Sequence, residues 1–83
     1  MLTSAQCRAA RGLVDWSQRE LAQRAGVGIV TIRQLEAAIH EPRRATLDVV
    51  RRALEAAGVE FIDENGGGAG VRLGKPVNAP KPK

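Results

Sequence analysis

The stretch QRELAQRAGVGIVTIRQLEA, residues 18–37, constrains the fold more than any other part of the chain. Small Ala22 stands where two crossing helices would come closest, and Gly26 lies one position past a helical run, where a left-handed cap is needed. The apolar residues that supply the buried faces are Leu21, Ala25, Val27, Ile32 and Leu35. Together these features predict two short helices joined by a tight turn, a helix-turn-helix.

A further helix is predicted before this stretch. Thr3, with Gln6 three positions later, forms a capping box, in which each side chain accepts a hydrogen bond from the other residue's backbone N–H. We therefore expect a first helix over residues 4–14. Its inward face should carry Cys7, Ala10 and either Leu13 or Val14.

Three more helices follow from the same kind of signal. Ser17 and Glu20 repeat the capping-box pattern before a second helix over residues 18–25. A third helix should begin after Gly28 and end near residue 37 or 38. A loop over residues 39–43 follows, in which Pro42 prevents the helix from continuing, and a fourth helix is predicted over residues 44–57. Its apolar face consists of Leu47, Val50, Leu54 and Ala57.

The segment WSQRELAQRAGVGIVTIRQLE, residues 16–36, resembles the DNA-binding domain of the phage-repressor and Cro family, also called the Xre family. The resemblance covers roughly residues 3–58. It implies a mainly α fold, a compact domain of four to five helices whose third helix lies in the major groove of DNA. The following segment ALEAAGVEFIDENGGGAGVRL, residues 53–73, resembles the end of short bacterial regulators that carry this domain and little else.

The resemblance also implies which residues contact DNA. The third-helix positions that match the family's base-contacting positions are Ile29, Val30, Thr31, Arg33 and Gln34. Arg33 can pair with guanine O6 and N7, Gln34 can pair with adenine N6 and N7, and Thr31 can contact a phosphate or a thymine methyl. The two apolar positions, Ile29 and Val30, can contact thymine methyls or form a protein-docking patch.

Backbone phosphate contacts and one internal ion pair are implied in the same way. Gln18, in the first turn of the second helix, can bind phosphate beside the positive end of that helix. Arg43 and Arg44 match a loop that often meets phosphate, with solvated charges as the alternative. Arg11 and Glu36 match a structural ion pair of the family, and removing one partner of such a pair costs about 3 kcal/mol when the other is left buried.

The last third of the chain predicts a β-hairpin and a tail. Strands at 59–62 and 71–73 flank a Gly-rich turn, and 74–83 reads as a disordered basic tail, either a solvated end or a phosphate-binding arm. An isolated hairpin is marginal in water, so it must pack on the helices or pair with another chain. We assign dimerisation to its apolar residues Val59, Phe61, Val71 and Leu73. The expected layout is a DNA-binding domain at 1–58, a dimerisation hairpin at 59–73, and the tail.

Composition limits the other possibilities. With 83 residues and two aromatics, the chain can hold one domain with a small core and little room for a catalytic pocket. The net charge of +4 favours an anionic partner, and residues 1–58 carry +3 of it, from nine Arg against six acids. No apolar run approaches the ~20 residues of a membrane span, and no signal peptide is evident, so we expect a cytoplasmic protein.

Enzymatic and metal chemistry find no support in the sequence. Cys7 is the single cysteine and is expected in the core, where burial makes a thiol unreactive. His40 has no Cys or second His at ligand spacing, and the GGGAG run links two strands instead of opening a helix. We therefore expect no catalytic residues, no metal and no cofactor.

The sequence thus predicts a sequence-specific DNA-binding transcriptional regulator, a repressor that acts as a dimer on a short palindrome of double-stranded DNA. The alternative is a protein-interaction module, an antiactivator or antitoxin-like partner, that grips another regulator with the same helix-turn-helix surface.

Overall fold

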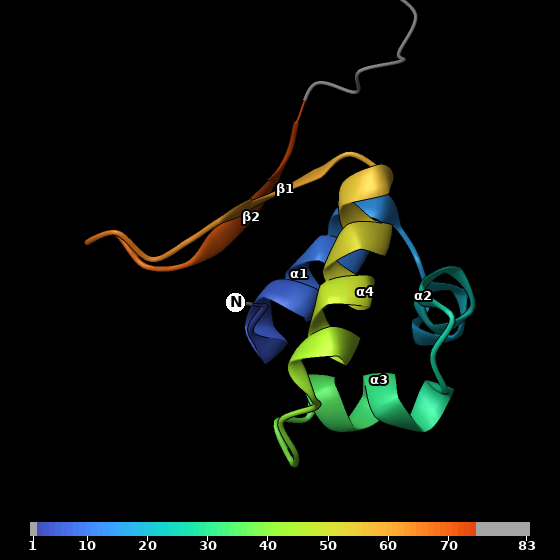
Figure 1. The fold of residues 1–83 in the computed structure, drawn as a ribbon. Helices are drawn as coiled ribbons and strands as arrows, with labels where there is room; N and C mark the ends of the chain where they lie inside the picture. Colours follow the sequence, from blue (N-terminus) through green and yellow to red (C-terminus); the bar gives the residue numbers. More distant parts are fainter. Residues whose placement is uncertain (1, 75–83) are drawn as a thin grey trace, which may run out of the picture.

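The computed structural model describes residues 2–74, which form four helices followed by a two-stranded antiparallel sheet (Figure 1). The elements are α1 (Ser4–Val14), α2 (Gln18–Ala25), α3 (Ile29–Glu36), α4 (Arg44–Ala56), β1 (Val59–Ile62) and β2 (Gly70–Leu73). The predicted mainly helical domain with a C-terminal hairpin is confirmed. The tail predicted to be disordered lies, from residue 75 onward, outside the described residues.

The first two helices begin at side-chain caps. At α1, the Gln6 N–H donates to Thr3 Oγ1 and the Thr3 N–H donates to Gln6 Oε1, each at 3.0 Å, so the predicted capping box is confirmed. At α2, Ser17 Oγ accepts from the Glu20 N–H at 3.0 Å. The predicted second box is only half formed, because the Glu20 carboxylate pairs with Arg24 at 2.7 Å, and a charged donor is a stronger partner than a backbone amide.

The turn between α2 and α3 is held by Gly26. Its φ of 73° places it in the left-handed region, where a residue without Cβ is favoured. The Val27 N–H then donates to the Ala22 carbonyl at 3.0 Å, which satisfies one of the last free carbonyls of α2. The tight turn predicted at this glycine is therefore present.

One hydrophobic core joins the helices and the hairpin. Its largest fully buried side chains are Leu21, Ile32, Leu47, Leu54, Val50 and Cys7. Of the two alternatives at the end of α1, Val14 packs against the core, whereas Leu13 is 38% exposed. Ala57, predicted on the buried face of the fourth helix, is exposed, because α4 ends at residue 56 and its periodicity stops there.

The hairpin packs on α1 and α4 instead of standing alone. Val59 is opposite Leu73 and Phe61 is opposite Val71 in the sheet. Val59 is only 3% exposed, and Phe61 and Val71 are partly buried against the core. Of the two fates predicted for the ribbon, packing on the helices is therefore realised within one chain.

Two glycine substitutions should change stability in opposite directions. Gly12 lies within α1, and a Cβ there would meet nothing within 4 Å. We expect Gly12→Ala to raise the free energy of unfolding by up to about 1 kcal/mol, because alanine loses less backbone entropy in a helix. Gly26 is equally open but has a φ of 73°, so Gly26→Ala should lower it by about 1 kcal/mol. Urea unfolding of both variants checks this, and changes of the same sign would contradict it.

Candidate nucleic-acid interface

Helix α3 has one buried and one exposed face. It lies at the end of the helical part away from the hairpin (Figure 1). Ile32 and Leu35 are buried in the core. On the outward side, Val30 is 55% exposed and Arg33 is exposed, while Thr31 and Gln34 are partly exposed. The outer face of α3 is therefore a mixed surface of apolar, hydroxyl, amide and guanidinium groups.

Ile29 differs from the other predicted base-contacting residues. Its side chain is partly buried and packs against the core. Residues three positions apart lie on the same side of a helix, so Ile29 shares the inward side with Ile32. The structure thus leaves Val30, but not the whole of the Ile29–Val30 pair, as an open apolar surface at the start of α3.

The end of α3 is held by the carboxylate of Glu36, which is 4% exposed. Arg11 binds it with two hydrogen bonds, from Nε to Oε2 and from Nη2 to Oε1, both at 2.7 Å. Gln18 Nε2 donates to Oε1 at 3.0 Å, and Cys7 Sγ donates to Oε2 at 3.2 Å. One buried carboxylate therefore joins α3 to both α1 and the start of α2.

The charge states in this cluster follow from these contacts. Burial by itself raises the pKa of Glu36, but hydrogen bonds from Arg11, Gln18 and Cys7, with the Arg11 charge, outweigh it and lower the pKa. The hydrogen bond to Glu36 raises the pKa of Arg11, and burial followed by the bond to Glu36 raises that of Cys7. The pair is therefore ionised, and Cys7 is a neutral thiol that acts as a donor.

Gln18, predicted to contact phosphate, lies at the start of α2 with its amide turned toward Glu36. The amide group carries two hydrogens, so this internal bond leaves one further donor. The residue is partly exposed. In this structure Gln18 therefore has a role within the protein that the sequence did not indicate.

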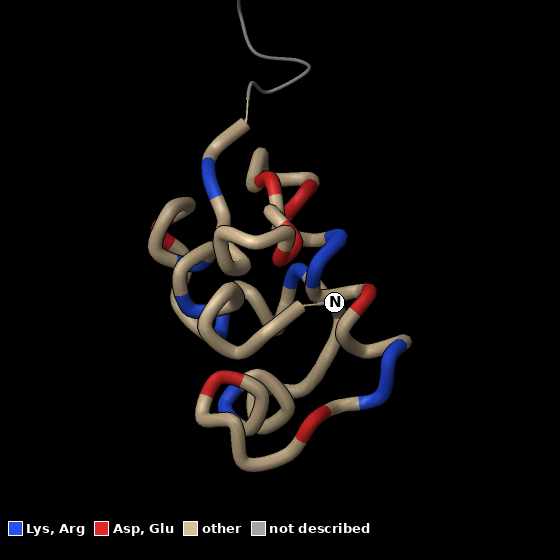
Figure 2. Tube along the Cα trace, turned by 90° about the vertical axis from the view of Figure 1, so that its left-hand side faces the viewer, with Lys and Arg blue, Asp and Glu red and all other residues tan. Residues whose placement is uncertain are grey.

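Arg43 and Arg44 lie exposed at the start of α4. Arg43 is the N-cap residue, and its side chain makes no capping hydrogen bond. The first-turn amides of α4 thus lack a side-chain cap, and unsatisfied amides at a helix start favour anions. Figure 2 shows basic and acidic positions interspersed along the trace, and the hairpin carries Glu60, Asp63 and Glu64 with one base, Arg72.

Two residues in this part of the molecule were missed by the sequence analysis. Arg8 Nη1 donates to the Glu36 carbonyl, at the last residue of α3. Its position one turn before Arg11 on α1 was the available signal. Gln6 was expected only as a cap, yet its Nε2 also donates to the carbonyls of Ile62 and Gly70, at 3.2 and 3.0 Å. No local pattern shows such a long-range contact.

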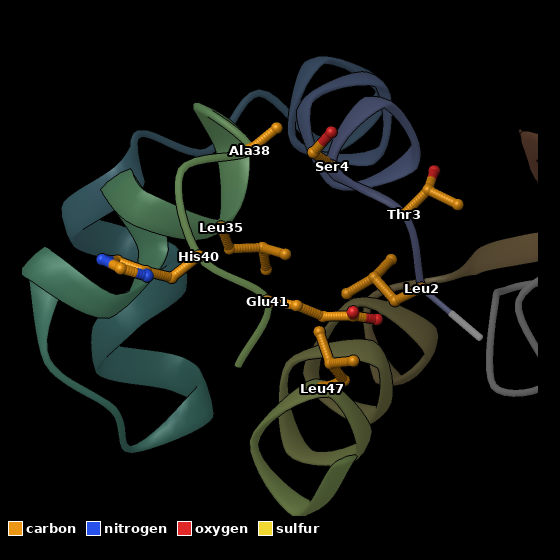
Figure 3. A pocket seen from close by; sticks show the side chains of 8 residues that line it. All are labelled: Leu2, Thr3, Ser4, Leu35, Ala38, His40, Glu41 and Leu47. Atoms are coloured by element: carbon orange, nitrogen blue, oxygen red, sulfur yellow. The ribbon is translucent and has the colours of Figure 1, made fainter. Parts of the chain in front are cut away.

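A cavity of about 320 Å³ lies between the start of α1, the end of α3 and the loop before α4 (Figure 3). Leu2, Leu35 and Leu47 point into it, and the ring of His40 points away from it. Glu41 also lines the cavity, with its side chain between those of Leu2 and Leu47. Among residues 2–74, no group of three or more His, Cys, Asp or Glu side chains is placed to hold a metal ion.

None of the helices formed by residues 2–74 is both long and apolar enough to cross a membrane. A comparison with curated proteins finds no match to the chain. A family model described as helix-turn-helix, of the Xre type, matches residues 8–62, which is more than half of the chain and includes all of α2, α3, α4 and β1. The chain therefore belongs to the Xre-type helix-turn-helix family of DNA-binding transcription regulators.

Proposed function

We propose that this protein is a transcriptional repressor that binds a short palindromic operator as a dimer. The observation that carries the proposal is α3 itself, whose exposed face presents Arg33 and, partly, Gln34, while the Glu36 cluster holds its end. A rigid helix with exposed donors and acceptors suits base recognition in the major groove. In a dimer, the half-sites would lie one DNA turn apart, ~34 Å.

Each exposed residue has a role in this proposal. Arg33 binds guanine O6 and N7, Gln34 binds adenine N6 and N7, and Val30 packs against a thymine methyl. Thr31 contacts a backbone phosphate or a second thymine methyl group. The backbone phosphates are bound by the remaining amide hydrogen of Gln18 and by the guanidinium groups that precede and begin α4, Arg43 and Arg44.

Alanine at either base-contacting position should weaken specific binding. We expect Arg33→Ala and Gln34→Ala each to cost about 1 to 3 kcal/mol on the selected operator, because each loses a bidentate base contact. Far-ultraviolet circular dichroism should not change, since neither side chain is in the core. The operator is first obtained by selection from random duplexes at low salt.

A charge-matched control is Arg52→Ala, which removes one exposed Arg from the second half of α4. It should lower affinity much less than Arg33→Ala at equal salt. If both α3 variants bind the selected DNA as well as the unchanged protein, the assignment of Arg33 and Gln34 is wrong.

A second candidate function is supported by exposed apolar side chains at the two ends of α3. Val30 in its first turn is 55% exposed, and Ile39 just beyond its end is 65% exposed. Large apolar side chains flanking a helix suit a protein partner. In this alternative the protein is an antiactivator or antitoxin-like module and has little DNA affinity. Random-duplex selection separates the two, since failure to enrich any sequence at low salt favours the protein partner.

The dimer contact is assigned to the hairpin, residues 59–73, with one revision to the set of residues. Val59 is buried within its own chain, whereas Leu73 is 56% exposed and can meet a partner. Because Val59, Phe61 and Val71 contribute to the core, truncation at Gly58 would also destabilise the helical domain. Assembly is therefore better tested by substitutions at the hairpin than by its removal.

A further inference from the structure

Each strand of the hairpin has an outer edge, on which backbone N–H and C=O groups point away from the partner strand. The Gly74 N–H donates to the Gly58 carbonyl at 2.8 Å, so Gly58 and Gly74 are directly opposite residues of the hydrogen-bonded type in the antiparallel sheet. Because such pairs alternate along an antiparallel ladder, Glu60–Arg72 and Ile62–Gly70 are also hydrogen-bonded pairs. The N–H and C=O groups of the intervening residues face outward: Val59 and Phe61 on β1, Val71 and Leu73 on β2.

The two edges differ in how well they are covered. β1 follows α4 directly and packs on it, and Val59 is 3% exposed. Its cross-strand neighbour Leu73 lies on the same face of the sheet but is 56% exposed. β2 packs on α1 and Val71 contacts the core, but this cover does not extend to Leu73. Within residues 2–74, no backbone partner outside the hairpin reaches the outward groups of either strand, so exposure distinguishes the edges. β1 has one buried residue, Val59, whereas β2 has none and ends in the exposed Arg72 and Leu73. The outer edge of β2 is the open one.

We propose that the outer edge of β2 pairs antiparallel with the same edge of a second copy of this chain. The inference rests on the proposed dimeric regulator and specifies its contact. A twofold axis at Arg72 puts Val71 of each chain opposite Leu73 of the other. Each such pair exchanges two backbone hydrogen bonds, and the two hairpins become one four-stranded sheet.

The side chains fit this register. Val71 and Leu73 lie on the face that packs toward the helices, so each exposed Leu73 gains an apolar cross-strand neighbour. On the opposite face, Arg72 would stand beside its symmetry mate, which is unfavourable for like charges. Each Arg72 is, however, already paired with Glu60 at 2.6 Å within its own hairpin. The row across the sheet is then Glu, Arg, Arg, Glu, with no net charge.

The site of this contact is compatible with DNA binding. The hairpin lies away from α3 in Figure 1, so joining two hairpins leaves both α3 faces open. The hairpin, residues 59–73, carries three acids against one base, Arg72, and this net charge of −2 does not favour DNA phosphates. A second copy is therefore a better occupant of this edge than nucleic acid.

The test compares Leu73→Pro with Leu73→Ala in the full chain. Proline removes the outward N–H without breaking a bond inside the hairpin, whereas alanine keeps that N–H and removes most of the side chain. Sedimentation equilibrium should show the dimer dissociation constant raised at least about tenfold by Leu73→Pro, because two inter-chain bonds are lost, and raised less by Leu73→Ala. Circular dichroism checks that both variants are folded.

Amide exchange of the unchanged protein tests the same contact without mutation. The Val71 and Leu73 amides should be protected at high concentration and exchange at least about tenfold faster on dilution below the dissociation constant. Concentration-dependent protection of Val59 and Phe61 instead would overturn the choice of edge. A dimer that persists in Leu73→Pro, or a monomer at every concentration, would overturn the proposal. Neither measurement uses DNA, so failure to select an operator is a separate result that refutes the regulator and not the contact.

Discussion

Replacement of Arg11 by alanine is expected to lower the free energy of unfolding by about 3 kcal/mol, because the Glu36 carboxylate would lose both of its guanidinium hydrogen bonds while staying buried. Glu36 would keep only the donors of Gln18 and Cys7. Equilibrium unfolding in urea measures the loss. Base preference in operator selection should not change, since the partner of Arg11 lies within the protein.

Two controls make this prediction specific to the buried pair. Replacing both residues, as Arg11→Met with Glu36→Leu, should recover most of the lost stability, because apolar residues of similar volume need no charge partner. Glu20→Gln removes one partner of the exposed Glu20–Arg24 pair and should change stability by less than about 0.5 kcal/mol. Unchanged unfolding of Arg11→Ala together with altered base preference would mean that Arg11 contacts DNA.

The same pair makes a contribution that depends on pH. The pKa of Glu36 is lowered in the folded protein, so its contribution is complete above the unfolded-state value, about 4.3 for a free Glu, and is lost as pH falls through the folded-state pKa. In Glu36→Gln this loss should be absent. The difference in free energy of unfolding between the unchanged protein and Glu36→Gln should therefore shrink as the pH is lowered.

Replacement of Gln6 by glutamate is expected to cost about 2 to 3 kcal/mol and to loosen the hairpin. Gln6 is 4% exposed, and its Nε2 donates to the carbonyls of Ile62 and Gly70. A carboxylate would still accept from the Thr3 N–H, but it would face two carbonyl oxygens without a proton to donate. Urea unfolding gives the cost, and faster amide exchange in β1 and β2 than in α1 would show where the structure loosens.

The control for Gln6→Glu separates the capping of α1 from the two hydrogen bonds that Gln6 makes to the hairpin. Thr3→Ala removes the capping acceptor of α1 but leaves Gln6 Nε2 free to bind the hairpin. It should cost about 1 kcal/mol, the usual value of an N-cap, without faster exchange in the strands. Equal effects of both variants on strand exchange would show that the cap, and not the two bonds to the hairpin, sets the hairpin's stability.

The order of the elements, the starts of the helices and the tight turns were predictable from the sequence, whereas the ends of the third and fourth helices were off by one or two residues. Helix starts at Thr3 and Ser17, the left-handed turn at Gly26 and the glycine-rich hairpin turn were all readable, because caps and turns depend on residues within a few positions of each other. The resemblance to the Xre family added the Arg11 and Glu36 positions, which the structure brings to 2.7 Å. For these features, local chemistry and motif spacing were sufficient.

Which side chains these elements bring into contact depends on how the elements pack in three dimensions. Val14 rather than Leu13 packs on the core, Ile29 is partly buried, and Val59 is buried in its own chain. These outcomes depend on how each helix or strand is rotated against its neighbours, which hydrophobic periodicity leaves uncertain by about one residue. The contacts of Gln6 to the hairpin and of Gln18 to Glu36 span 56 to 64 and 18 positions along the chain. The distant hydrogen-bond partner of a polar side chain cannot be predicted from the sequence. The partner depends on which groups are buried together, because buried donors and acceptors must be satisfied.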